Sequence, residues 1–175
     1  IKQELDKVFK GNNPFWFVAL LDETNMLKRI FPKLYDNKWI NQPLRYHPFD
    51  VYTHSMMVLF HTQKLSDDYL LRYAALYHDV GKVEQYTSYT MGLDQDGIRD
   101  VFASWLNHPV CGAEFTQKDF RALWFSKKEI VCLLLSREVL VKNWSLKNGI
   151  TWRIMFFATK NSLKLSVDKK PCSIA

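Results

Sequence analysis

The chain has 175 residues, 15% of them aromatic, and a formal net charge of +6. This length suits one domain around a single core, and a composition rich in aromatic residues with only six glycines argues against disorder. The longest apolar runs, residues 16–21 and 130–135, are too short to cross a membrane and are expected to be core segments.

Apolar residues recur at helical spacing in the N-terminal part of the chain. Gly11 is expected to end the first helix, and Asn13 followed by Pro14 favours an N-cap and a first helical position for the second. Residues 33–48 have no sustained period and predict a linker. The helical segments expected before this linker are residues 1–9, 15–21 and 26–30.

The helical pattern returns at Asp50, which can cap a helix that carries His54. Ser66, with two aspartates directly after it, opens the next helix, because negative charge in a first turn complements the helix dipole. Gly81 is a natural C-terminal stop for that helix.

The rest of the chain also lacks the alternating pattern of a strand, so the predicted fold class is all-α. Residues 86–99 are polar and turn-forming. Ser126 and Glu129 have the spacing of a capping box. Further helical segments are expected at residues 101–106, 110–123 and 130–135, with a last helix that opens at Thr151.

His54 lies in one apolar segment, and the pair His78-Asp79 lies near the end of the next. Imidazole and carboxylate groups together suit a divalent first-row metal, and two antiparallel helices could bring these three groups to one ion. A metal held in this way lowers the pKa of bound water and neutralises a phosphoryl oxygen, as phosphate-ester hydrolysis requires. Lys82 could meet the phosphate as a point charge, although a surface lysine near a helix end is the plainer interpretation.

Four stretches carry a family resemblance: E-L-D-K with L-L-D-E-T-N-M-L-K-R-I-F-P-K-L in residues 1–34, R-Y-H-P-F-D-V-Y-T-H-S, A-A-L-Y-H-D-V-G-K, and S-W-L-N-H-P-V-C-G-A-E-F. The H…HD pattern resembles the HD superfamily of metal-dependent phosphohydrolases. The flanking sequence is similar to the tRNA-binding and HD regions of bacterial CCA-adding tRNA nucleotidyltransferases and their poly(A) polymerase relatives. The resemblance covers roughly residues 1–130, and the loop histidine before the Gly-Ala helix start of that family corresponds to His108.

This resemblance implies an HD helical bundle at residues 45–175, preceded by a tRNA-binding helical segment at residues 1–44. It implies a divalent metal ion, for which the ligand set does not choose among Mg, Mn, Ni, Fe and Zn. The implied substrates are phosphomonoesters or 2′,3′-cyclic phosphates of nucleotides or RNA ends. Asp79 would orient the attacking water, while Lys82 and His108 would contact the phosphate. The expected metal ligands are His54, His78, Asp79 and, from the closing segment L-K-L-S-V-D-K-K, Asp168.

Two departures from the family keep a second hypothesis open. The chain has no G-G-x-V-R-D segment, and its one D-x-D pair, Asp94 and Asp96, lies in a polar turn, so it should not add CCA without a nucleotidyltransferase head elsewhere in the parent protein. The family pattern also fades after residue 130, so the fourth ligand rests on Asp168 alone. The protein could therefore be a tRNA-binding scaffold with idle HD residues. A third hypothesis is a signalling HD hydrolase of guanine nucleotides, but the flanking residues resemble the tRNA enzymes more.

The positive charge lies in the last part of the chain, because residues 126–175 hold 10 basic and 3 acidic residues and the first 125 hold 14 and 15. A basic tail suits tRNA or another polyanion, and a solvated cationic face is the alternative. Three cysteines without CxxC spacing (Cys111, Cys132 and Cys172) predict free thiols in a reducing cytoplasm. The chain shows no signal peptide and does not begin with Met, so we expect a piece of a longer or processed protein.

Other side chains have plain alternatives to a functional role. His61 is expected to be a hydrogen-bonded core residue, and Asp50 could serve as cap, as a partner of His54, or as both. His108 could instead serve the helix start beside Pro109. The residues before the motif helix could line a pocket mouth or form a linker: Arg45, Tyr46 and His47. Four aromatic residues are expected in the core rather than as platforms for bases: Trp16, Phe17, Trp105 and Trp124.

Overall fold

The structure is a computed structural model that describes residues 1–41, 49–84 and 108–145, and each regular element in these ranges is a helix. The all-α prediction is therefore confirmed for this part of the chain. None of the described helices is long and apolar enough to span a membrane. The helices are α1 (Lys2–Lys10), α2 (Pro14–Glu23), α3 (Leu27–Ile30), α4 (Pro32–Tyr35), α5 (Val51–Leu65), α6 (Tyr69–Tyr77), α9 (His108–Ala122) and α10 (Lys127–Ser145).

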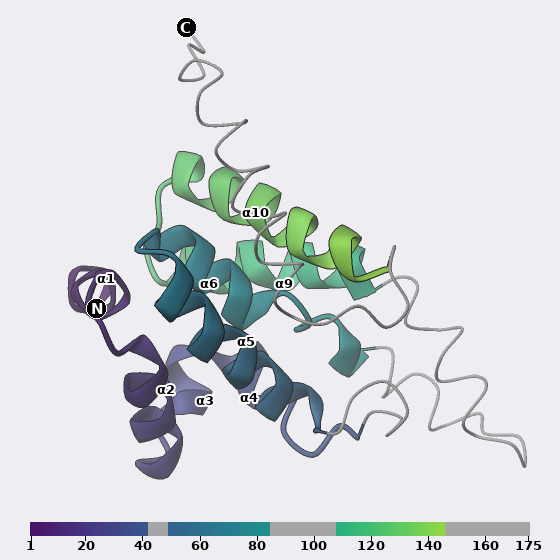
Figure 1. Ribbon diagram of the computed structural model, residues 1–175, viewed down its shortest axis with the longest axis horizontal. Helices are drawn as coiled ribbons and strands as arrows, with labels where there is room; N and C mark the ends of the chain where they lie inside the picture. Colours follow the sequence, from purple (N-terminus) through teal and green to yellow (C-terminus); the bar gives the residue numbers. More distant parts are fainter. Residues whose placement is uncertain (42–48, 85–107, 146–175) are drawn as a thin grey trace, which may run out of the picture.

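Helix α6 is the centre of the arrangement. It packs against α5 on one side and against α10 on the other, and α9 lies beside α10 (Figure 1). The short N-terminal helices cover the remaining side, where α1 contacts α6, α2 contacts α5 and α4 contacts α9. Every side chain of α6 from Leu71 to Tyr77 is buried, as expected for a helix enclosed by neighbours.

One hydrophobic core joins the N-terminal helices to the later ones. The ring of Phe9 stacks on that of Tyr73, with centroids 3.7 Å apart and planes 14° apart. Tyr73 in turn meets Phe120 of α9 edge to face at 5.2 Å. Val18 and Leu34 belong to the same buried cluster. The helices before residue 44 are thus packed into the body of the fold.

The N-terminal predictions were mostly confirmed, with two corrections. The first helix ends before Gly11, and Pro14 occupies the first position of α2. Asn13 stands at the N-cap, but its side chain makes no capping hydrogen bond. The predicted linker of residues 33–48 was wrong at its start, because Pro32 opens a short helix whose Leu34 is fully buried. A four-residue helix is too short to show a period in sequence.

Two tryptophans expected in the core are exposed. Trp16 lies on the outer side of α2 with 63% of its surface accessible, and Trp124 follows the end of α9 with 85% accessible. Trp124 has a φ of 69°, so the chain leaves the helical path there and turns the ring to solvent. Phe17 does pack against the core, half-buried. Trp105 lies outside the described residues, as do residues 86–99 and 101–106 and the helix expected from Thr151.

The predicted helix starts of α5 and α6 are close to those observed. Asp50 caps α5, since its Oδ1 accepts a hydrogen bond of 2.6 Å from the amide of Thr53. Asp68 caps α6 by accepting from the amides of Leu70 and Leu71. Ser66, expected to open this helix, instead ends α5, and its hydroxyl accepts from the amide of Asp68. The aspartate has the better geometry because only its carboxylate reaches two free amides of the first turn.

The capping box at the start of α10 is confirmed. Glu129 Oε2 accepts a 2.8 Å hydrogen bond from the amide of Ser126, and the Ser126 hydroxyl accepts from the amide of Glu129. The other carboxylate oxygen of Glu129 pairs with Lys2 at 2.9 Å and accepts from the hydroxyl of Tyr69 at 3.0 Å. This one side chain therefore ties α10 to α1 and α6. The helix itself runs to Ser145, ten residues further than expected.

Replacing Glu129 by Gln should lower the free energy of unfolding by about 0.5 to 1 kcal/mol at neutral pH, because glutamine keeps the capping box but loses the charge that faces Lys2. Partial burial opposes ionisation of this carboxyl, but hydrogen bonds from Ser126 and Lys2 outweigh it and lower the pKa of Glu129 to about 2. A carboxyl with a lowered pKa stabilises the fold above its ordinary value of 4.5, and this contribution disappears as the pH falls towards 2.

Urea unfolding of the two proteins at a series of pH values tests this expectation. The difference between them should shrink steadily below pH 4.5. A difference that stays constant down to the lowest pH would mean that the charge of Glu129 contributes nothing.

Candidate metal centre

Helix α5 places His54 one turn after the cap at Asp50. The backbone amide of His54 donates to the Asp50 carbonyl at 2.9 Å, so the cap also fixes the first helical hydrogen bond at the histidine. The second carboxylate oxygen of Asp50 accepts from the amide of Trp39. His54 is buried, and its ring meets that of His78, which directly follows α6. Of the two roles considered for Asp50, the capping role is therefore observed.

The other two residues of the motif stand in a turn after α6 rather than inside the helix. Helix α6 ends at Tyr77, and His78 to Gly81 form the turn. The amide of Val80 donates to the Tyr77 carbonyl at 3.4 Å, and that of Lys82 donates to the Asp79 carbonyl at 3.0 Å. In this turn two adjacent side chains can face one point, as a regular helix with its rotation of about 100° per residue would not allow.

His54, His78 and Asp79 converge as the sequence predicted. The Nε2 atoms of the two histidines are 3.2 Å apart. Asp79 Oδ2 lies 3.2 Å from His78 Nε2 and 3.7 Å from His54 Nε2. All three side chains are buried, and among the residues described they form the one group of three or more His, Cys, Asp or Glu side chains with metal-ligand spacing.

The backbone selects the tautomer of His78. Its Nδ1 lies 2.8 Å from the carbonyl oxygen of Ala75, one turn earlier. A carbonyl only accepts hydrogen bonds, so Nδ1 carries the hydrogen and, in the neutral imidazole, Nε2 keeps its lone pair. This lone pair points to the centre shared with His54 and Asp79, which is the arrangement that metal-ligating histidines adopt.

Two further basic side chains meet Asp79. Lys82 Nζ lies 2.7 Å from Asp79 Oδ2, and His108 Nε2, from the start of α9, lies 3.4 Å from Oδ1. Burial opposes ionisation of Asp79, but the charge of the Lys82 ammonium group and the hydrogen bond from His108 outweigh it and hold the pKa of Asp79 well below its ordinary value. Asp79 is therefore a carboxylate at neutral pH, as a metal ligand must be.

The donor set fits a divalent cation of the first transition row. Nitrogen and oxygen donors lie about 2.0 to 2.2 Å from such an ion, which places neighbouring donors roughly 3 Å from one another. The three observed separations, 3.2, 3.2 and 3.7 Å, are close to this spacing without any movement of the backbone. Two imidazoles and one carboxylate leave open coordination positions for water and substrate, as in catalytic sites.

The two residues predicted to contact the phosphate, His108 and Lys82, differ in how accessible they are to solvent. His108 reaches Asp79 with its ring partly accessible, whereas Lys82 is only 4% exposed and directs its amine at the carboxylate. Lys82 is thus no surface lysine. His61 is half-buried on α5, where its ring packs edge to face on that of Phe60, and it stays outside the cluster.

Several predicted residues lie outside the described part of the chain. These are the fourth ligand, the D-x-D pair and the residues before the motif helix: Asp168, Asp94, Asp96, Arg45, Tyr46 and His47. Cys111 and Cys132 are free thiols as expected. Cys172 is also outside the described residues.

Gly81 has a different role from the helix stop that was expected, since α6 ends four residues earlier. A Cβ atom at Gly81 would overlap the carbonyl oxygen of His108 and would lie 2.6 Å from the amide nitrogen of Gly112. The backbones of the motif turn and of the first turn of α9 are therefore in direct contact. Glycine is required there for close approach, and this contact brings His108 to Asp79.

Two buried polar side chains near the site were missed from sequence. Asn37 donates from Nδ2 to the carbonyl of Val80 in the motif turn, at 3.4 Å. Arg137 of α10 is 2% exposed and donates from Nε to the carbonyl of Tyr77. The spacing of Leu133, Arg137 and Leu140 would have placed the arginine on the core face of a longer helix. Because the helix was expected to end at residue 135, Arg137 was not considered as a helical residue.

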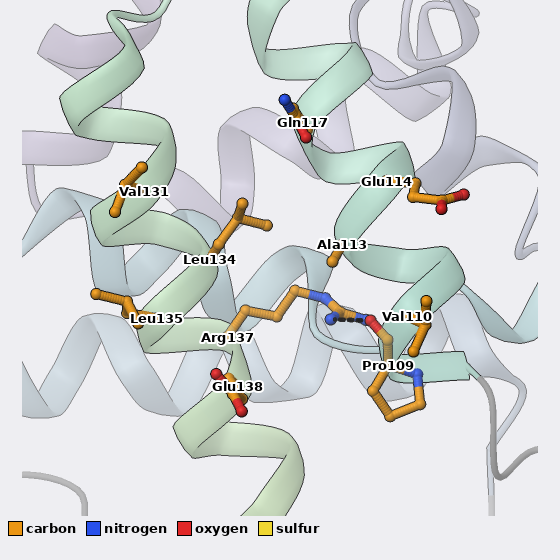
Figure 2. Close-up of a pocket in the computed structure, with 10 residues that line it drawn as sticks. All are labelled: Pro109, Val110, Ala113, Glu114, Gln117, Val131, Leu134, Leu135, Arg137 and Glu138. Carbon is orange, nitrogen blue, oxygen red and sulfur yellow. Dashed lines mark hydrogen bonds between the residues drawn. The ribbon is translucent and has the colours of Figure 1, made fainter.

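An apolar groove runs between α9 and α10, with Arg137 crossing it towards the start of α9 (Figure 2). Its walls include Val110 and Ala113 from α9, and Leu134 and Leu135 from α10. Val110 and Leu135 are more than half exposed. The motif residues do not line this groove.

Comparison with known proteins identifies the family to which the chain belongs. No solved structure matches the chain. The family described as the HD domain matches residues 51–157, more than half of the chain, and this span contains His54, His78, Asp79 and His108. The convergence of its histidines and aspartate on one buried point agrees with that match. The chain belongs to the HD domain family.

Proposed function

We propose that this chain is a divalent-metal-dependent phosphohydrolase domain of a protein related to CCA-adding tRNA nucleotidyltransferases. Its substrates would be phosphomonoesters or 2′,3′-cyclic phosphates of nucleotides or RNA ends, including tRNA. The observation that carries the proposal is the buried cluster of His54, His78 and Asp79, whose donor atoms have the spacing of a metal site. The sequence around the motif and the excess of basic residues after residue 126 support the nucleic-acid context.

Each residue has a part in this chemistry. His54 and His78 would hold the cation through nitrogen and Asp79 through oxygen, and the bound ion would supply Lewis acidity towards water and a phosphoryl oxygen. The Ala75 carbonyl keeps the His78 ring oriented. Asp79, ionised and fixed by several hydrogen bonds, would also orient the attacking water.

Two basic side chains would act on the phosphate. His108 stands at the accessible edge of the cluster, 3.4 Å from Asp79, and would donate a hydrogen bond to a phosphate oxygen. Lys82 now neutralises Asp79, and its flexible stem would let the amine share a hydrogen bond with an entering phosphate.

The position of Lys82 also favours the second candidate, an idle tRNA-binding scaffold. Its ammonium group lies 2.7 Å from the oxygen that would ligate the cation. A divalent metal ion bound to that oxygen would therefore lie close to the positive charge of the lysine, which repels it. A protein that has lost its metal could use such a lysine to stabilise the remaining carboxylate.

Hydrolysis of bis(p-nitrophenyl) phosphate and of 2′,3′-cyclic AMP with Mn, Ni or Mg distinguishes the two candidates. Turnover should require added metal, and His78→Ala should lower it by more than about 100-fold because a ligand and its lone pair are lost. His61→Ala is the matched control, since this histidine lies on the packed helix α5 but outside the cluster, and it should leave turnover unchanged.

The scaffold predicts the opposite result. Metal-supplemented protein would hydrolyse neither substrate, would bind tRNA with an affinity that falls steeply with salt, and would bind it equally well after His78→Ala.

A further inference from the structure

Arg137 connects three backbone carbonyls around the candidate metal centre. Its Nε donates to Tyr77 O at 3.1 Å, Nη1 to Pro109 O at 2.8 Å and Nη2 to His108 O at 3.3 Å. Figure 2 shows the side chain crossing from α10 to the start of α9, where the bond to Pro109 is drawn. The planar guanidinium offers donors in fixed directions, so the three bonds together fix the carbonyls relative to one another.

The residues that carry these carbonyls are those that position the site. Tyr77 directly precedes His78 and Asp79, and His108 itself reaches Asp79. One guanidinium therefore joins the end of α6 to the start of α9 at the point where the two halves of the site meet. No other described contact joins both of these backbone segments to α10 through one side chain.

The guanidinium packs directly against the backbone of Gly112. A Cβ atom at Gly112 would overlap Nη2 of Arg137 and would lie 2.7 Å from its central carbon. The same glycine lies against Gly81 of the motif turn. Burial lowers the pKa of Arg137 to about 10, whereas the negative charge of Asp79 raises it, so the group stays cationic at neutral pH.

A purely structural role is the competing explanation, and Arg72 illustrates it. Arg72 is equally buried and pairs with Asp67. It also donates to backbone carbonyls at the end of α1 and at the end of α5, those of Phe9, Gly11, Gln63 and Ser66. None of these carbonyls belongs to a site residue or to its neighbour in sequence. Arg72 is thus a control that, like Arg137, is buried and binds several backbone carbonyls, but away from the site.

We propose that Arg137 is a positioning residue for the candidate metal centre, holding His108 in register with His78 and Asp79. The inference rests on the proposed function to the extent that the cluster binds a divalent cation. Residues that orient metal ligands from behind typically change metal affinity or activity by about 10- to 100-fold when they are replaced. A lysine at this position keeps the charge but cannot donate in three fixed directions.

The test compares Arg137→Lys and Gly112→Ala with Arg72→Lys. Gly112→Ala keeps the arginine, but its methyl group would displace the guanidinium and lie 3.1 Å from the amide nitrogen of Gly81, so Arg137→Lys carries the test and Gly112→Ala supports it. Mn²⁺ affinity is measured by titration calorimetry, and the imidazole ring signals of the histidines are recorded by NMR in the metal-free protein. Both site variants should weaken Mn²⁺ binding by about 10- to 100-fold and shift the signals of His78 and His108 but not of His61. Arg72→Lys should lower the thermal midpoint and change neither readout.

A lower thermal midpoint for Arg137→Lys with unchanged Mn²⁺ affinity and unchanged histidine signals would overturn the positioning role. The two proposals fail separately. If the wild-type protein binds no Mn²⁺, the proposed function fails, and the His78 and His108 signals of the metal-free variants still decide the role of Arg137. If it binds Mn²⁺ but hydrolyses nothing, both readouts for Arg137 remain valid.

Discussion

Asp79→Asn is expected to abolish metal-dependent hydrolysis and to destabilise the fold by about 3 to 5 kcal/mol, since removing one partner of a buried ion pair leaves the other charge uncompensated. Asp79 Oδ2 lies within 3.7 Å of both histidine Nε2 atoms and 2.7 Å from Lys82 Nζ. The asparagine keeps the shape of the side chain but cannot neutralise the lysine or a cation. Metal affinity should fall by more than about 100-fold.

The double variant Asp79→Asn with Lys82→Met separates the two effects. Methionine removes the buried charge and fills a similar volume, so urea unfolding should recover most of the lost stability. Metal affinity and hydrolysis should remain lost, because the negatively charged carboxylate ligand is not restored. If the single variant is as stable as the wild type, the pairing of Asp79 with Lys82 adds no net stability and this part of the argument is wrong.

Gly81→Ala should have the second large effect. The added methyl group would overlap the carbonyl oxygen of His108, and the other contacts are also backbone atoms, so no flexible side chain can move aside. Overpacking of this kind typically costs about 1 to 3 kcal/mol, and the upper end is expected here. The turn and α9 must separate, so metal affinity should fall as well.

Gly11→Ala is the matched control for this substitution. A Cβ atom at Gly11 would lie 3.2 Å from the carbonyl oxygen of Val8, a tight contact but no overlap, and its φ of −77° suits any residue. Its cost should be under about 1 kcal/mol, without a change in metal affinity. Thermal unfolding and Mn²⁺ titration of both variants would contradict the close-approach argument if the two alanines behaved alike.

The convergence of His54, His78 and Asp79 could be predicted because residue type and short spacing carry the information. Asp50 and the Ser126–Glu129 pair were predictable for the same reason, since caps depend on neighbours three residues away. The neighbours of Gly81 are not local. From sequence, Gly81 is expected to end a helix. The reason that only glycine fits there is the backbone of α9, which begins 27 residues later in the chain.

Arg137 illustrates a related difficulty. An arginine after an apolar run is most often solvated, and its burial depends on how far α10 continues. Helix ends are the least certain part of a sequence pattern, so an error of ten residues in α10 removed Arg137 from the core face. Trp124 was expected in the core because its position fits the apolar period. Its exposure goes with a φ of 69°, and the spacing of apolar residues does not predict a backbone angle.

The stacking of Phe9 on Tyr73 has a consequence for how such a protein can change over time. Helix α1 and its neighbours supply part of the hydrophobic core around α6. An unrelated N-terminal sequence therefore could not replace them without exposing that core. Any ancestral recombination that separated the two stretches would have had to repair the exposed aromatic surface at once. Helices α1 to α4 and the segments that carry His54 and His78 are therefore expected to be inherited together.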